Sequence, residues 1–253
     1  MTTVGGDAPA ARASTGRFFA EPLREYVQAG PGRQVCVLQA GCLAPLRELG
    51  LGELAEAGYE VSVSVADADE PLPRAVLDQV RDAYDDVITG DLRTVPLPPR
   101  GFDVVYCGRL IERVPNVELV LDRLVSALRP GGLLFIRTAD RDSARARLDR
   151  LLPGEARAAI WRRFHPGVPG PFPAVYEEAA SERGIASYAL LRGLVIAQRS
   201  AELTAPGGPG RLASAVRLAC AAISRLSRGR YDDGHDELLY VIRKPEDRSA
   251  RVV

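Results

Sequence analysis

Residues 90–137 read GDLRTVPLPPRGFDVVYCGRLIERVPNVELVLDRLVSALRPGGLLFIR, and this stretch decides the fold class. The run Phe102–Cys107 is almost wholly apolar, which is typical of a strand buried on both faces of a sheet. Asn116–Leu128 carries apolar residues at helical spacing and predicts an amphipathic helix. The sequence Arg-Pro-Gly-Gly ends that helix and leads into a second apolar strand, Leu133–Arg137. A strand, a helix and a strand in this order predict a parallel βαβ unit.

The same alternation continues on both sides of this stretch. Towards the N-terminus we expect helices over Arg17–Ala29, Pro45–Ala57 and Pro73–Ala83, and strands over Gln34–Ala40, Glu60–Ala66 and Asp86–Thr89. Towards the C-terminus we expect helices over Ser143–Phe164 (broken near Pro153), Glu177–Gly184 and Arg211–Arg228, strands over Gly193–Ala197 and Leu238–Ile242, and irregular Pro/Gly-rich stretches over His165–Pro173 and Leu203–Gly210. This order predicts an α/β fold with a mostly parallel, doubly wound sheet.

These patterns divide the chain into three parts. Residues 1–16 begin with small and polar residues and are expected to form a disordered tail. Residues 17–243 form one α/β domain, within which residues 141–192 interrupt the alternation as an insertion. Residues 244–253 form a charged tail.

Charge and hydropathy exclude several kinds of partner. Lys+Arg and Asp+Glu both total 33, so the chain has no net basic field that would hold nucleic acid. No apolar run approaches the ~18 residues of a membrane span, and residues 1–14 lack the basic start and apolar stretch of a signal peptide. We therefore expect a cytoplasmic protein, not bound to a membrane, whose partners are small molecules or proteins.

The cysteines and histidines give no sign of a metal site. The four cysteines are Cys36, Cys42, Cys107 and Cys220. No two of them form a CxxC pair, and three of the four lie in apolar runs. Buried thiols in a reducing compartment explain this usage. The two histidines, His165 and His235, lie at no ligand spacing from a cysteine, so we expect no zinc.

The order of motifs resembles the class I S-adenosylmethionine-dependent methyltransferases. The resemblance is most specific over residues 90–137: an acidic residue after the third strand, a Phe-Asp strand, a Leu-Ile-Glu turn, a helix, and Arg-Pro-Gly-Gly before the fifth strand. It implies a Rossmann-like, mostly parallel seven-stranded sheet with helices on both faces and a strand hairpin at the end. It also implies S-adenosylmethionine (SAM) as cofactor, and it makes the insertion at 141–192 a substrate cap.

The resemblance assigns a cofactor site to the ends of the first four strands. The acidic residue that ends the second strand accepts the ribose hydroxyls in this family; here it is Asp67, with Asp69 as the fallback. Asp91 corresponds to the residue that meets the adenine amine. The implied cofactor residues are Gln39, Gly41, Cys42, Asp67, Asp91, Leu92 and Gly108. A solvated acidic turn at Asp67, and a turn or helix-capping role for Asp91, are the alternatives.

The glycine-rich loop of the family is altered in this chain. Residues 37–45 read VLQAGCLAP, so that Leu43 and Pro45 replace two glycines and Gln39 replaces an acidic residue. Leu43 adds bulk where backbone should meet ligand, and a positive φ there would cost about 1–3 kcal/mol. Pro45 removes an N–H, although proline suits a first helical turn. Arg113 stands where a histidine often follows the glutamate of the family. These changes predict weakened or rerouted cofactor binding.

The insertion supplies the candidate substrate residues. His165 is the candidate general base, because its ordinary pKa suits proton transfer near neutrality, although a surface turn explains it as well. The remaining candidates for the substrate pocket are Asp140, Trp161 and Tyr176, with Phe164, Phe172 and Glu177 nearby. Arg109, just past the fourth strand, is a further candidate, because the family meets the reactive end of the cofactor there. Packing of the cap explains the aromatic residues equally well, and surface ion pairs are the alternative for Asp140. The helix at 211–228 is expected to pack on the domain or to form a homodimer contact.

Three functions remain open at this point. The first is SAM-dependent methyl transfer to a small-molecule acceptor, for example in secondary metabolism. The second is a catalytically inactive methyltransferase-like protein: a pseudoenzyme, scaffold or regulatory partner. The third is the same fold turned to a different reaction, because fold alone does not decide function.

Overall fold

The computed structural model describes residues 9–30, 32–203 and 211–246, except for the side chains of residues 9–16, 164, 211 and 212. Seven strands form one sheet in the order β3-β2-β1-β4-β5-β7-β6. Their bounds are β1 Gln34–Ala40, β2 Glu60–Asp67, β3 Asp86–Thr89, β4 Phe102–Gly108, β5 Leu128–Ala139, β6 Val195–Glu202 and β7 Glu237–Arg243. β7 runs antiparallel to both of its neighbours, and the other pairs are parallel. The expected α/β class and mostly parallel seven-stranded sheet are confirmed.

The central strands are buried because their sequences are apolar on both faces. Every residue of β4 is buried, and so is every residue of β1 from Val37 to Ala40. β5 starts at Leu128, earlier than the expected Leu133, because the Arg-Pro-Gly-Gly segment stays in the strand with an irregularity in its pairing to β4. The expected helix end is therefore right, but no separate turn follows it.

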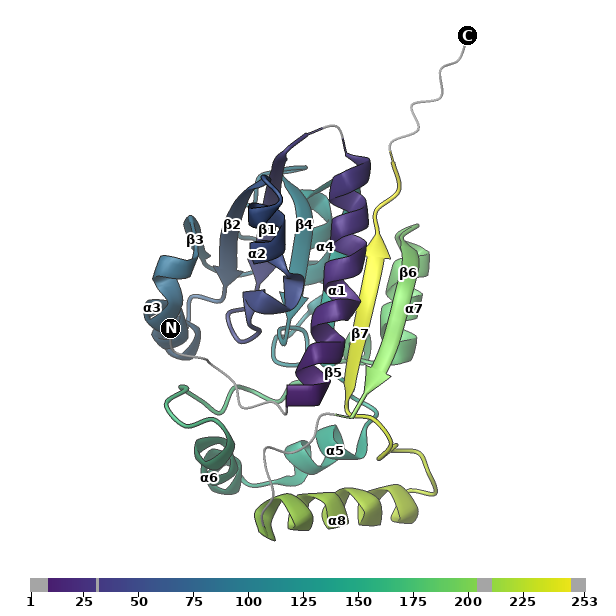
Figure 1. Ribbon diagram of the computed structural model, residues 1–253. Coiled ribbons are helices and arrows are strands. Elements are labelled where there is room, and N and C mark those ends of the chain that lie inside the picture. The colour runs from purple at the N-terminus through teal and green to yellow at the C-terminus, as the bar shows by residue number, and fades with distance from the viewer. Residues whose placement is uncertain (1–8, 31, 204–210, 247–253) are drawn as a thin grey trace.

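Helices cover both faces of the sheet (Figure 1). Their bounds are α1 Pro9–Ala29, α2 Leu51–Glu56, α3 Pro71–Val80, α4 Val117–Ala127, α5 Ala144–Leu151, α6 Gly154–Phe164, α7 Glu182–Leu191 and α8 Arg211–Leu226, with short 3-10 turns η1 Leu46–Leu49, η2 Arg81–Ala83 and η3 Glu178–Ala180. α1 and α2 bury Phe19, Leu23 and Leu54 on one face of the sheet. α4 and α7 bury Leu121 and Ile185 on the other.

Several boundaries differ from those expected. α1 begins at Pro9, so the helix extends into the expected disordered tail 1–16; residues 1–8 lie outside the described residues. The helix expected over Pro45–Ala57 is interrupted at Gly50, which adopts a positive φ of 66° between η1 and α2. The expected Leu203–Gly210 linker falls almost entirely outside the described residues, as does most of the tail 244–253.

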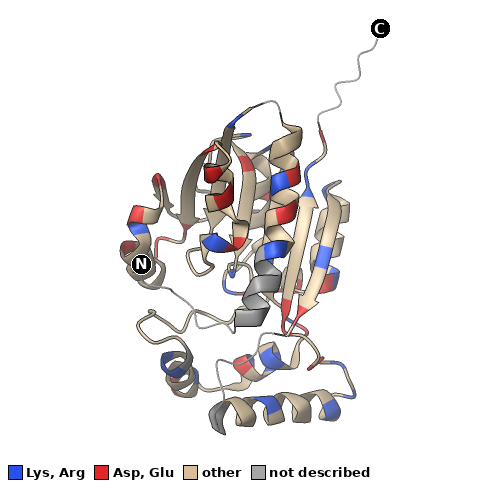
Figure 2. Ribbon diagram, viewed as in Figure 1, with Lys and Arg blue, Asp and Glu red and all other residues tan. Residues whose placement is uncertain are grey.

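The cap is built from two separate parts of the chain. α5, α6 and α8 lie beyond the carboxyl ends of the parallel strands (Figure 1), and α8 packs against α5. α7 falls within the expected insertion 141–192, but it packs on the sheet beside β6. α8 carries arginines and no acidic residue (Figure 2), and its packing on the domain was one of the two roles expected for it. Within the described residues, no helix has the length and apolar character needed to cross a membrane.

The loop after β1 and the end of β4 approach so closely that Gly108 has no room for a side chain. A Cβ on Gly108 would overlap the Cβ of Ala44 and lie 2.9 Å from the ring of Tyr106. We predict that Gly108→Ala lowers the free energy of unfolding by about 3 kcal/mol or more, which is the upper end of the range for overpacking. Urea denaturation followed by circular dichroism measures this change.

Gly52 provides the matched control. It lies in α2 with nothing near the position of an added Cβ. Gly52→Ala should stabilise the protein by about 0.4–1 kcal/mol, because alanine restricts the unfolded chain. Equal effects of the two substitutions would contradict the close approach at Gly108.

Candidate functional site

The carboxyl ends of β1, β2 and β4 meet at the point where the family resemblance places the cofactor. Gly41 follows β1 with a φ of 89°, and its N–H donates to the carbonyl of Ala66 at 2.9 Å. A Cβ on Gly41 would lie 3.0 Å from the carbonyl oxygen of Gly108 and 3.3 Å from the guanidinium of Arg113. Glycine is therefore required at Gly41 both by its conformation and by its neighbours.

Gln39 holds the loop after β1 in shape. Its side-chain amide donates to the carbonyls of Gly41 at 2.7 Å and Ala44 at 2.9 Å, while its oxygen accepts a hydrogen bond from Tyr84 at 3.1 Å. The side chain is fully buried, so these protein groups use most of its hydrogen-bonding capacity. Gln39 thus works as a structural brace for the loop in this conformation.

Leu43 and Pro45 do not strain the loop. Neither residue is among the described residues with positive φ, and Pro45 has a φ of −78° immediately before η1. The expected conformational cost at Leu43 is therefore wrong, because the loop follows a path that suits these residues. Leu43 instead packs among apolar side chains that include Leu72 and, from the cap, Phe172.

Asp67 lies at the end of β2, as expected, with its carboxylate fully buried. One oxygen accepts the N–H of Ala68 at 2.7 Å, and the other accepts the N–H of Cys42 at 2.8 Å. A terminal nitrogen of Arg113 lies 2.9 Å and 2.7 Å from the two oxygens. Cys42 therefore contributes its backbone to this site, and its thiol, whose pKa is raised by burial and by Asp67, stays protonated.

Arg113 reaches Asp67 from the turn after β4. Its Nε donates to the carbonyl of Arg109 at 3.0 Å, and its guanidinium lies over the ring of Phe172 at 4.9 Å. Burial works against the charged guanidinium, but the Asp67 carboxylate outweighs this effect and raises the pKa of Arg113 above its ordinary value. Because a Cβ added at Gly41 would lie 3.3 Å from its guanidinium, the side chain of Arg113 lies close to the carboxyl end of β1.

The Asp67 carboxylate has no capacity left for a ribose. A carboxylate offers about four lone-pair positions, and here four donor contacts from three protein groups occupy them. Two ribose hydroxyls would require Arg113 to leave. The residues present in this conformation therefore do not fit SAM in the way the resemblance implies.

The two residues expected at the adenine make other contacts. Asp91 is exposed and pairs with Arg93, whose guanidinium lies 2.8 Å and 2.7 Å from its oxygens. Hydrogen bonds from Arg93 lower the pKa of Asp91 to about 2. Asp91 also accepts the N–H of Arg93 within a turn, which is the role proposed as its alternative. Leu92 is buried in the core against the α4 face of the sheet.

A second group of buried charges lies beside the Arg113 pair. Arg137 of β5 contacts Glu48 of η1 and lies 2.9 Å from Glu237 of β7, which in turn lies 2.6 Å from Arg109. Tyr106 donates to Glu48 at 2.6 Å. Burial disfavours the charge on Arg137, but Glu237 and Glu48 raise its pKa. Arg109, expected in the substrate pocket, is thus held by Glu237 in this conformation.

The remaining substrate candidates lie in different places. Trp161 donates to the carbonyl of Val168 at 3.0 Å and stacks with His165 at 4.3 Å, so both lie on the cap. The hydroxyl of Tyr176 lies 3.4 Å from a carboxylate oxygen of Asp149. Asp140 is buried, and its carboxylate lies 2.8 Å from Nε2 of His235, so surface ion pairing is ruled out for Asp140. No described contact links His165 with Asp67, so its catalytic role stays a prediction. The side chain of Phe164 lies outside the described residues.

Sequence reasoning missed two features of this region. Glu177, expected near substrate, caps α4 by accepting the N–H groups of Asn116 at 2.8 Å and Val117 at 3.0 Å. Arg113 was visible only as a replacement for histidine, and nothing in the sequence pairs it with a residue 46 positions away. A buried arginine needs a carboxylate partner, but the sequence does not show that Arg113 is buried, so it gave no signal of this ion pair.

Comparison with known proteins agrees with this architecture. The profile of the methyltransferase domain family matches residues 29–168, more than half of the chain, and the chain belongs to this family. No curated protein matches the sequence.

Solved structures share the fold at low sequence identity. The plantazolicin methyltransferase BpumL, in complex with a triazolic desmethylPZN analogue and SAH, has a TM-score of 0.55 at 13% identity, covering 94% of this chain and 86% of BpumL. A proposed sarcosine dimethylglycine methyltransferase from Galdieria sulphuraria has a TM-score of 0.54 at 14% identity, covering 92% and 86%. The [4+2]-cyclase SpnF has a TM-score of 0.52 at 14% identity, covering 97% and 88%. At these identities the likeness concerns the fold.

The buried ion pair predicts a large effect of truncating Arg113. Arg113→Ala leaves the Asp67 carboxylate buried without its counter-ion, which should lower the free energy of unfolding by about 3–5 kcal/mol. Equilibrium denaturation in urea measures the change. The control is Arg93→Ala, which breaks an exposed aspartate–arginine pair and should leave stability close to that of the wild type. Comparable losses in both variants would contradict a special role for the buried pair.

Proposed function

We propose that this protein is a methyltransferase family member that does not transfer methyl groups from SAM, and that it acts through binding as a scaffold or regulatory partner. The single observation that carries the proposal is that Arg113 occupies the two hydrogen-bonding positions of Asp67 that the backbone N–H groups of Cys42 and Ala68 leave open. In this reading the family's ribose acceptor has become half of an internal ion pair.

The energy needed to open the site supports this proposal. Separating a buried ion pair typically costs about 3–5 kcal/mol when one partner is removed. At about 1.4 kcal/mol for each factor of ten, cofactor binding that displaces Arg113 would be weakened by a hundredfold to several thousandfold. A cofactor would recover part of this cost only if Arg113 found another partner.

The cap adds a second obstacle. Phe172 is buried and lies over the guanidinium of Arg113, while Leu43 packs against the same apolar cluster. A guanidinium over an aromatic face gains about 0.5–2 kcal/mol. Moving Arg113 out would therefore also disturb the contact between the cap and the sheet.

A second candidate function is SAM-dependent methyl transfer to a small-molecule acceptor. The observation that favours it is the retention of Gly41, with its positive φ, beside Asp67 at the end of β2. In this reading Arg113 swings away when the cap opens, Gln39, Cys42, Asp91, Leu92 and Gly108 surround the cofactor, and His165, Arg109, Asp140, Trp161 and Tyr176 surround the acceptor. A role in secondary metabolism belongs to this second candidate function. With either function, we propose that the protein is cytoplasmic and forms a homodimer.

Calorimetric titration with SAM and with its demethylated product separates the two functions. We expect no heat of binding by the wild type at up to about millimolar ligand, the weak end of ordinary affinities. Arg113→His restores the residue that the family often carries there and removes the guanidinium nitrogen that contacts both oxygens of Asp67, so it should bind the cofactor at least tenfold more tightly than the wild type. Micromolar binding by the wild type that is lost in Asp67→Ala would overturn the proposal in favour of the enzyme.

Arg129→His is the matched control for this experiment. Arg129 pairs with Asp103 at 2.6 Å, away from the carboxyl ends of the strands. It should leave cofactor binding as it is in the wild type. If Arg113→His is too unstable to titrate, Arg113→Gln keeps a hydrogen-bond donor for Asp67 without the charge and tests the same point.

A further inference from the structure

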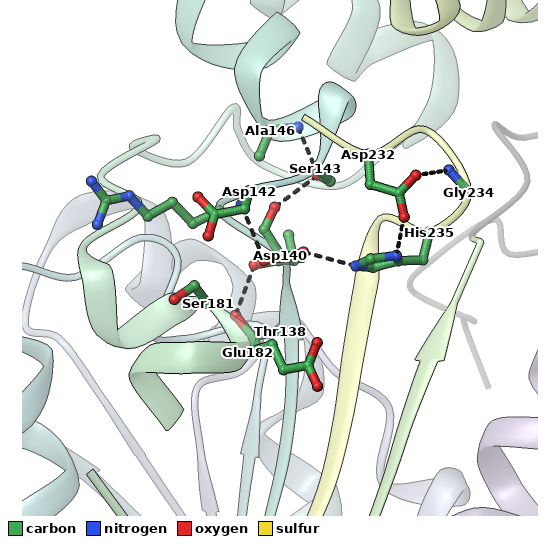
Figure 3. A network of polar contacts seen from close by, with 12 residues as sticks. Thr138, Asp140, Asp142, Ser143, Ala146, Ser181, Glu182, Asp232, Gly234 and His235 are labelled. Carbon is green, nitrogen blue, oxygen red and sulfur yellow. Dashed lines mark hydrogen bonds and ion pairs between the residues drawn. The ribbon is translucent and has the colours of Figure 1, made fainter. Parts of the chain in front are cut away.

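His235 lies between two carboxylates at the junction of the cap and the sheet (Figure 3). Its Nε2 is 2.8 Å from a carboxylate oxygen of Asp140, and its Nδ1 is 2.9 Å from a carboxylate oxygen of Asp232. Asp140 is buried, whereas Asp232 is more than half exposed. This group lies outside the Arg113 site and has no part in the proposed function.

The hydrogen bonds of this group require one more proton than the neutral side chain supplies. A neutral imidazole has one N–H donor and one acceptor nitrogen. With two ionised carboxylates as neighbours, both ring nitrogens must donate, which only the imidazolium can do. Burial raises the pKa of Asp140, and this favours keeping the shared proton in the group.

The group joins the two chain segments that connect the sheet to the cap. Asp140 belongs to the connection from β5 to α5, and His235 belongs to the connection from α8 to β7. Three backbone hydrogen bonds run between the same connections: Ala144 N–H to the carbonyl of Asp232 at 2.7 Å, Asp232 N–H to Asp142 at 3.2 Å, and Asp140 N–H to Asp236 at 2.9 Å. Loosening the His235 contacts would therefore loosen the attachment of the cap.

Charged side chains of both signs lie on the segments around His235. The titratable and charged side chains on these segments include Arg141, Asp142, Arg145, Arg147, Glu182, Arg199, Glu202, Cys220, Arg228, Arg230, Tyr231, Asp233, Asp236, Glu237 and Tyr240. Arg145 lies 3.4 Å from Asp236. When the shared proton leaves, the neutral imidazole keeps a single N–H, so one of the two carboxylates, Asp140 or Asp232, faces the lone pair of a ring nitrogen, which is unfavourable.

The group is not a hydrolytic triad. The hydroxyl of Ser143 donates to the carbonyl of Asp140 at 2.7 Å and accepts the N–H of Ala146 at 3.1 Å, so it caps α5 (Figure 3). No described contact joins this hydroxyl to His235. The described residues also contain no group of three ligating side chains suited to a metal ion.

We propose that His235 is a proton-dependent clamp between the cap and the sheet, closed while the shared proton is bound and loosened when that proton is lost. The sign follows from the proton count: the clamped state binds the extra proton more tightly than the open state does. The clamp therefore holds at low pH and weakens as the pH rises.

Hydrogen exchange tests this proposal on the whole chain. Protection factors for the amides of Ala144 and Asp232, corrected for the intrinsic rate, are measured from about pH 5 to about pH 9, the range that spans imidazole titration. In the wild type we expect the protection factors to fall as the pH rises. The total fall should equal the factor by which clamping strengthens binding of the shared proton. His235→Gln should flatten this dependence, whereas His165→Gln, which changes the other histidine, should leave it intact.

Proton NMR of the imidazole provides the second measurement. In His165→Gln, His235 is the sole histidine, so its ring resonances are assigned without ambiguity. The loss of amide protection should be complete once the pH has risen through the titration midpoint of these resonances, which reports the clamped state. A loss of protection that continues well above that midpoint, or a pH dependence that persists in a folded His235→Gln protein, would overturn the proposal. If His235→Gln does not fold, Asp232→Asn removes the exposed negative charge beside the imidazole and should lower the midpoint.

Discussion

The ion pair between Asp67 and Arg113 is the interaction on which the carboxyl edge of the sheet depends. It joins the end of β2 to the turn after β4 across the end of β1, so three strands share one buried contact. Each charge needs the other, because a lone buried ion is costly. The close packing of Gly41 against Arg113, and the position of Phe172 over the guanidinium, follow from this pair.

Much of this edge satisfies its polar groups internally. Glu48, Arg137 and Glu237 form a second buried charged group, and Gln39 braces the loop that a cofactor would otherwise approach. Enzymes commonly leave polar groups at such an edge for their ligands. Here the same kinds of residue, at family positions, are used to stabilise the protein. The family architecture is therefore compatible with polar groups at this edge that contact one another.

The cap is attached by chain segments far apart in the sequence. The connection from β5 to α5 and the connection from α8 to β7 meet around Asp140 and His235, which are 95 positions apart. α8 packs on α5 beside these segments, and the polar contacts between the two connections fix their relative position. This arrangement explains why α8, which follows the sixth strand in the chain, belongs to the cap.

The sequence by itself determined which segments form strands and that the central strands are buried. Runs such as Phe102–Cys107 and Leu238–Ile242 are apolar enough to require burial wherever they occur, and their alternation with helices restricts the sheet topology. It also placed Asp67 correctly at the end of β2, because strand ends can be read from local composition. It failed at the start of α1, where the small residues after Pro9 carry no clear helical periodicity.

Only the tertiary structure decided what the polar residues contact. Periodicity reports which residues are buried, but it carries no information on which distant side chain supplies the opposite charge. Arg113 reaches Asp67, and His235 reaches Asp140, through the arrangement of strands and connections in space. The choice between a ligand-binding edge and a self-satisfied edge therefore depends on long-range geometry, because the same aspartate can accept a ribose hydroxyl or an arginine with equal chemical ease.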